Sequence, residues 1–157
     1  MRNTDDIAAT PHRHLPALNE RNRIFWQGGS EGKLKFYRCQ ACGHYIHPGA
    51  PVCPVCHSRD IAGEAVSGRA TIATYTINRQ RWEPGLEQPY IVAIVEIDEQ
   101  PSVRLTTTIV NCAIDAVHIG MKVKVIFDHR EDVWLPLFEP ALFEPALLEP
   151  ATAIGEE

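Results

Sequence analysis

Apolar and polar residues alternate along five runs in the second half of the chain. The runs are GRATIATYTI, PYIVAIVEID, SVRLTTTIV, MKVKVIFDHR and DVWLPLF, and turn residues such as Pro84-Gly85 and Ile119-Gly120 separate them. A period of two places alternate side chains on one face of a strand. The pattern therefore predicts five β-strands, with room for a helical turn at residues 111–118.

Five short strands with a break after the third are typical of the OB-fold, a five-stranded barrel whose small core about 75 residues can fill. A generic five-stranded sandwich or sheet is the alternative. The periodicity differs in LNERNRIFWQGG, where Leu18, Ile24 and Phe25 fall near helical spacing before Gly28-Gly29 ends the run. We expect one short helix there, or two with a turn at Gly32.

Four of the five cysteines stand in two CxxC pairs, Cys39 with Cys42 and Cys53 with Cys56. Each pair forms a knuckle that directs two thiolates at one ion, and two knuckles complete a tetrahedral shell. A shell of four thiolates leaves no position for water, so it indicates structural Zn²⁺ that supplies folding energy to a small domain. Iron in a rubredoxin-type shell remains the alternative, and a redox pair would need a βαβ context.

The other candidate ligands have simpler explanations. His44, His47 and His57 lie among the cysteines, but four thiolates already fill the shell, so we expect these histidines at the surface or supporting the ligands. Cys112 has no CxxC partner and follows an apolar run, which favours a buried, inert thiol over a nucleophile.

These patterns predict a mainly β protein with four parts. Residues 1–16 read as a flexible arm, 17–64 as the N-terminal helix and Cys₄ zinc ribbon, and 65–138 as the OB-fold barrel. Residues 139–157 contain LFEPA-type repeats with proline at every fifth position, which excludes a regular helix. We expect this tail to be extended or disordered, as a tolerated repeat expansion or as a segment that docks on a partner.

Charge and motifs limit the possible functions. The net charge of −5 divides into +2 for residues 1–64 (eight Lys/Arg, six Asp/Glu) and −7 for residues 65–157 (seven against fourteen), so the barrel half suits phosphate backbones poorly. No GxSxG, P-loop, GxGxxG or HExxH motif is present, and the carboxylates Glu96, Asp98 and Glu99 fit a solvated turn. With no spanning apolar run and no signal-like N-terminus, we expect a cytoplasmic protein without a membrane segment.

The order of these elements resembles the DUF35 family of zinc-ribbon and OB-fold proteins associated with acyl-CoA metabolism. GKLKFYRCQACGHYIHPGAPVCPVC, SGRATIATYTI, PYIVAIVEID and IGMKVKVIF carry the resemblance, which covers roughly residues 15–138. Its more specific parts are Gly68, Pro89-Tyr90 and Ile119-Gly120-Met121. His57 departs from the pattern, since many ribbons have glycine there, and the LFEPA tail lies outside it.

The resemblance implies a non-catalytic accessory subunit in a hetero-oligomer, with a thiolase-like or lipid-transfer-protein-like enzyme as partner and with no catalytic residue of its own. In such assemblies of lipid metabolism the partner acts as thiolase, aldolase or acyltransferase. The ribbon and N-terminal helix would dock on this partner, with aromatic anchors around Phe25 and Trp26. The OB domain would help to form a channel for the acyl-CoA ligand.

Arg79, Arg81 and Trp82 are the candidate contacts with acyl-CoA, because the two arginines end a strand and lead into a loop where they could hold phosphates. The same residues with Tyr75 would serve the rival function, a nucleic-acid-binding zinc-ribbon and OB module. An ordinary polar loop explains them as well, and a self-sufficient enzyme has the least support.

Overall fold

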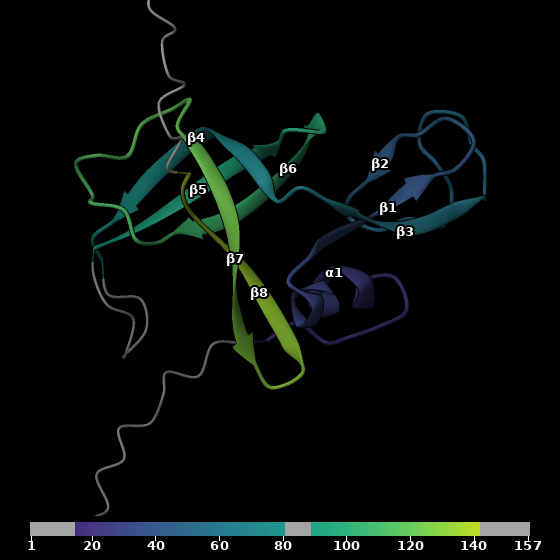
Figure 1. The fold of residues 1–157 in the computed structure, drawn as a ribbon, viewed down its shortest axis with the longest axis horizontal. Helices are drawn as coiled ribbons and strands as arrows, with labels where there is room; N and C mark the ends of the chain where they lie inside the picture. The colour runs from purple at the N-terminus through teal and green to yellow at the C-terminus, as the bar shows by residue number, and fades with distance from the viewer. Residues whose placement is uncertain (1–14, 81–88, 142–157) are drawn as a thin grey trace, which may run out of the picture.

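The computed structural model describes residues 15–80 and 89–141, and its elements follow one another along the chain as shown in Figure 1. They are α1 (Arg23–Gln27), the 3-10 helix η1 (Gly28–Glu31), β1 (Leu34–Cys39), β2 (Tyr45–Ile46), β3 (Ile61–Val66), β4 (Arg69–Asn78), β5 (Tyr90–Ile97), β6 (Gln100–Ile109), β7 (Lys122–Arg130) and β8 (Val133–Pro140). The described helices are too short and too polar to cross a bilayer.

The first three strands form a small antiparallel sheet in the order β2-β1-β3. Tyr37 of the central strand β1 pairs with Ile46 of β2 on one side and with Gly63 of β3 on the other. This sheet is separate from the barrel in Figure 1. Cys39 ends β1, and Cys42, Cys53 and Cys56 lie in the loops that follow β1 and β2.

The five predicted strands are β4 to β8, and they close into a barrel in the order β4-β5-β6-β8-β7. The prediction of an OB-fold is confirmed, and the sandwich or open sheet is excluded because the barrel is closed. Neighbouring strands run antiparallel except β6 and β8, which are parallel and pair at Ile109 and Phe138 alone. The segment after β6 makes a hydrogen-bonded turn at Ala113 to Ala116, without a helix.

The N-terminal helix is shorter than the sequence suggested. It ends at Gln27 with Gly28 as its C-cap, as Gly28-Gly29 predicted, and a 3-10 turn then runs from Gly28 to Glu31 and ends at Gly32, whose φ is 67°. Gly29 is needed for close packing, because a β-carbon there would lie 2.3 Å from Cβ of Trp134. The turn therefore sits directly on the β7–β8 hairpin.

One hydrophobic core runs through both halves of the molecule. Phe25, Leu34, Phe36 and Tyr45 belong to the same buried cluster as the barrel residues. The side-chain amide of Gln100 adds a polar link, since its oxygen accepts from the Tyr45 N–H at 2.8 Å and its nitrogen donates to the Tyr45 carbonyl at 3.1 Å. The ribbon and the barrel are thus joined by apolar packing and by a clasp on the backbone of β2.

The predicted division of the chain remains a prediction. Its boundary between residues 64 and 65 falls within β3, and the short link Ser67-Gly68 connects β3 to β4. Gly68 has φ of 76°, and a β-carbon there would approach Val125 to 2.5 Å. The arm lies outside the described residues except for 15 and 16, and so does the tail except for 139–141, of which Glu139 and Pro140 end β8.

Candidate metal centre and ligand groove

The two cysteine knuckles are built by the same pair of backbone hydrogen bonds. In the first, the Gly43 N–H donates to the Cys39 carbonyl at 2.8 Å and the Cys39 N–H donates to the His44 carbonyl at 2.9 Å. In the second, the His57 N–H donates to the Cys53 carbonyl at 3.0 Å and the Cys53 N–H donates to the Ser58 carbonyl at 2.9 Å. Each knuckle needs a left-handed residue four positions after its first cysteine, namely Gly43 with φ 77° and His57 with φ 60°.

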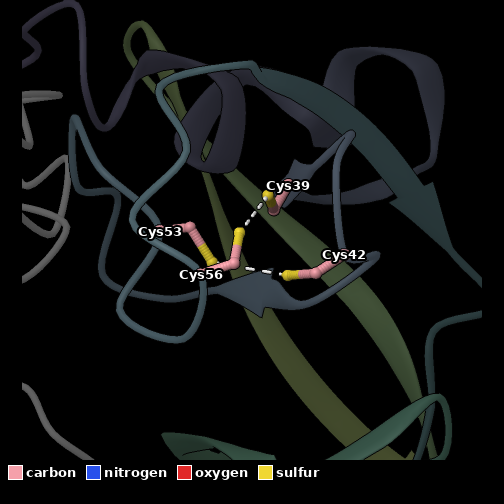
Figure 2. A group of neighbouring side chains, drawn as sticks. All are labelled: Cys39, Cys42, Cys53 and Cys56. Carbon is pink, nitrogen blue, oxygen red and sulfur yellow. Dashed lines mark hydrogen bonds between the residues drawn. The ribbon is translucent and has the colours of Figure 1, made fainter.

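The four thiols converge at one point, as Figure 2 shows. The sulfur atoms of Cys39 and Cys56 are 3.5 Å apart, those of Cys42 and Cys53 are 3.6 Å apart, and all four lie within 4.8 Å of one another. A tetrahedral zinc ion with Zn–S bonds of about 2.3 Å needs sulfur atoms about 3.8 Å apart. The cluster therefore has the size and ligand type for one structural zinc ion.

Burial and the knuckle N–H groups set the protonation of the thiols. Burial favours the neutral form of Cys39, but hydrogen bonds from the N–H groups of Cys42 and Ala41 and from neighbouring thiols outweigh it and lower its pKa to about 6. A hydrogen bond from the His44 N–H lowers the pKa of Cys42. The adjacent thiols and burial raise it by more, so that this pKa is about 12. Since metal binding requires thiolates, protons compete with the metal for this cluster.

The nearby histidines do not belong to the four-sulfur cluster. His47 packs among aromatic rings instead, 4.7 Å from Phe25 and 5.2 Å from Phe36 between ring centroids, and burial lowers its pKa. Cys112 is half-buried, and burial followed by the charge of Asp115 raises its pKa, so the neutral thiol is favoured. This agrees with an unreactive cysteine.

The predicted ligand contacts are only partly described. Arg79 directly follows β4, while Arg81 and Trp82 lie outside the described residues. Each of the other cations described in residues 65–141 is within 4.0 Å of a carboxylate, and these are Arg69, Arg104, Lys122, Lys124 and Arg130. Among the described barrel residues, Arg79 is therefore the cation available for a ligand.

A groove that the sequence did not reveal lies where α1 and β1 face β6 and β8, with a volume of about 570 Å³. Phe25, Phe36 and Leu105 line it, together with the cations Arg21 and Lys35. The apolar residues around Phe25, expected as partner anchors or as core, serve the core in part, since Phe25 is only 7% exposed. The groove combines four elements far apart in sequence, so no local motif marks it.

Comparison with known proteins gives consistent matches. A family model described as the rubredoxin-like zinc ribbon domain of ChsH2 matches residues 26–62, and one described as the C-terminal OB-fold domain of ChsH2 matches residues 63–128. A solved structure described as "Ltp2-ChsH2(DUF35) aldolase" aligns with a TM-score of 0.72 and 33% identity over 80% of this chain and 98% of that chain.

Two curated relatives extend the comparison. A protein of Thermomonospora curvata described as a probable enoyl-CoA hydratase alpha subunit is 35% identical over 133 residues, which are 83% of this chain but 40% of the relative. A DUF35 domain-containing scaffold protein of Methanothermobacter thermautotrophicus is 36% identical over 92 residues, 57% of this chain and 68% of the relative. The chain thus spans well under half of the hydratase subunit and about two thirds of the scaffold protein.

Proposed function

Because this chain belongs to the DUF35 family, we propose that it is a non-catalytic accessory subunit of an acyl-CoA-processing enzyme, with a thiolase-like or lipid-transfer-protein-like partner. The observation that carries this proposal is the alignment with 98% of a chain in the Ltp2-ChsH2(DUF35) aldolase structure. The name of the Thermomonospora relative, a hydratase alpha subunit, supports a role in acyl-CoA chemistry.

The described site supports an accessory role. The four thiols have the arrangement of a closed structural shell, in which zinc would hold the two knuckles together. Zinc in such a shell stabilises the fold and supplies no catalytic position. The catalytic residues of the assembly then belong to the partner.

The tip of the ribbon is a suitable docking surface for that partner. Val55, between the second pair of cysteines, is 60% exposed, and it is one of two large hydrophobic side chains that stand out in this way among the described residues. The other is Ile119 on a barrel loop, with 65% exposure. A rigid knuckle presents Val55 at little entropic cost, which favours association.

Arg79 is the described cation that suits the phosphates of an acyl-CoA, with Arg81 and Trp82 as further contacts of the same loop. An arginine with no carboxylate partner keeps its donors for a phosphate, to which it can bind in a bidentate manner. The ligand would approach the barrel at the end of β4 while its acyl group enters the partner.

The test is purification of the tagged chain from its native host at native expression level, followed by identification of the bound protein. We expect an acyl-CoA enzyme of the thiolase superfamily or a related aldolase or acyltransferase, and activity that requires both chains. Val55→Ser should weaken the complex, whereas the matched variant Ile119→Ser should not. Turnover of an acyl-CoA by the isolated chain would refute the accessory role.

The ligand contact is tested in the assembled complex. Arg79→Ala should raise KM for the acyl-CoA severalfold while kcat and assembly stay unchanged, because a bond to a remote phosphate contributes equally to the ground and transition states. Arg59→Ala, which removes an exposed cation from the ribbon, is the control. Equal effects of the two substitutions would rule out a specific role of Arg79.

A further inference from the structure

The groove beside α1 lies where β6 and β8 share little backbone pairing. The two strands pair at Ile109 and Phe138, and the Val110 N–H donates to the Phe138 carbonyl at 2.8 Å. Further toward their N-terminal ends, the described contact between them is a side-chain bond, from the Thr107 hydroxyl to the Pro136 carbonyl at 2.9 Å. Backbone pairing between β6 and β8 is therefore limited to the Ile109–Phe138 end, and residues of both strands line the groove opposite α1 and β1.

The groove lining combines apolar side chains with positively charged ones. Slightly more than half of the lining residues are apolar or aromatic, among them Ile24, Phe25, Trp26, Phe36, Leu135 and Leu137. Three cations, Arg21, Lys35 and Arg104, also line it, and within residues 15–80 and 89–141 no Asp or Glu does. Lys35 and Arg104 are bound to Glu31 and Glu96, but no carboxylate or hydrogen-bond partner is seen for the guanidinium of Arg21 within the described residues. A volume near 570 Å³ lies inside the range of roughly 300–1,000 Å³ typical of ligand sites.

The chain itself contains a segment with the complementary composition. Residues 142–157 read LFEPALLEPATAIGEE, with four glutamates, no Lys, Arg or His, and Leu or Phe at the start of each repeat. Residues 1–14 suit the groove less well, because they carry two Arg, two Asp and two His and, apart from Met1, a single large apolar residue, Ile7. Charge and apolar content thus distinguish the two ends of the chain.

The barrel already accommodates one copy of this repeat. The sequence LFEPA of residues 142–146 also occupies residues 137–141, where it ends β8. There Phe138 is fully buried in the core, and Glu139 bonds to Lys124 at 3.2 Å and to the Asn111 amide at 2.6 Å. The same five residues therefore bury an aromatic ring and bind a cation on the adjacent surface of this fold.

We propose that residues 142–157 bind the groove of their own chain, with Leu and Phe side chains on its apolar lining and glutamates at Arg21. The segment is long enough, because its 16 residues span about 50 Å when extended, whereas Leu135 at the groove and Ala141 at the end of β8 are about 20 Å apart along the strand. Attachment to the chain raises the local concentration of the segment to the order of millimolar, so modest affinity suffices to fill the groove. Any partner or ligand that uses the groove must then displace this segment.

The test compares the full chain with a variant that ends at Ala141. The buried clusters found in the described part of the chain consist of residues that precede this position, so the shortened chain keeps that core. A labelled synthetic peptide of residues 142–157 should bind the shortened chain and should bind the full chain at least fivefold more weakly. Arg21→Ala in the shortened chain should weaken peptide binding several-fold and reduce its salt dependence, whereas the neighbouring variant Arg23→Ala, outside the groove, should not.

A second measurement uses the full chain without truncation. Phe143→Ser combined with Leu147→Ser and Leu148→Ser should shift the NMR signals of the Trp26 indole and the Thr106 amide, which line the groove, and leave the Thr74 amide unchanged. Equal binding of the peptide and of a scrambled peptide would overturn the proposal. So would identical groove signals in the full and shortened chains, or groove signals that depend on protein concentration, which would indicate exchange between two copies. None of these measurements requires the enzyme partner, so they stand apart from the proposed function.

Discussion

His57 provides a direct test of how the backbone of a knuckle determines stability. It occupies the left-handed position that glycine occupies in the first knuckle, with φ of 60° against 77° for Gly43. Left-handed backbone costs a residue with a β-carbon about 1–2 kcal/mol. Glycine loses more chain entropy on folding, about 0.5–1 kcal/mol. His57→Gly should therefore raise the free energy of unfolding by about 0.5–1 kcal/mol.

The reverse change should have the reverse effect. Gly43→Ala should lower the free energy of unfolding by about 0.5–1 kcal/mol, by the same two opposing terms. A β-carbon at Gly43 would meet Arg38 no closer than 3.4 Å, so backbone conformation and not collision sets this cost. The exposed side chain of His57 makes no hydrogen bond or ion pair in the described part of the chain, so its removal adds no further term.

The assay is urea unfolding with saturating zinc, followed by circular dichroism, with midpoints compared at a common slope. Chelator competition gives a second readout, in which zinc affinity should rise about 2- to 5-fold for His57→Gly, because binding and folding are coupled. A destabilised His57→Gly variant would refute the reasoning, and so would a neutral Gly43→Ala variant, since each would show that left-handed backbone is not the governing cost.

Three further outcomes are expected. Elemental analysis should find one zinc per chain, and Cys53→Ser should abolish most metal binding and unfold the ribbon, because structural zinc contributes on the order of 10 kcal/mol; a folded, metal-free protein would contradict this. Single-stranded DNA or RNA should bind weakly at low salt, since carboxylates neutralise most described barrel cations, and micromolar affinity with a steep salt slope would favour the rival function. The Asn111 amide and then Lys124 hold the pKa of Glu139 below its usual value, so its stabilising contribution is present above the unfolded pKa of about 4.3 and is lost as pH falls through the lower folded value. Glu139→Gln should therefore reduce stability at pH 7 but match the unchanged protein in strong acid, and an equal difference at both pH values would exclude the linkage.

Local signals explain which parts of the fold the sequence predicts. The spacing of Cys39 and Cys42 predicts a knuckle because two thiolates three residues apart reach one ion, and the alternation in PYIVAIVEID predicts β5 because it reports a strand buried on one face. The burial of Phe25 cannot be predicted from its neighbours in sequence, because it depends on packing against Phe36 and His47. The groove needs Arg21, Arg104 and Leu137 at one place, which chain folding alone brings about.

The clasp between Gln100 and Tyr45 makes the metal centre a fixed reference point for the whole molecule. Two bonds to one peptide backbone, added to a shared core, resist both rotation and sliding of the ribbon against the barrel. The distance between Val55 at the ribbon tip and Arg79 at the barrel edge is then fixed. If a paramagnetic ion replaced zinc, it would shift the NMR signals of nuclei in the ribbon and in the barrel. A rigid molecule requires that a single magnetic tensor fits the shifts of both halves.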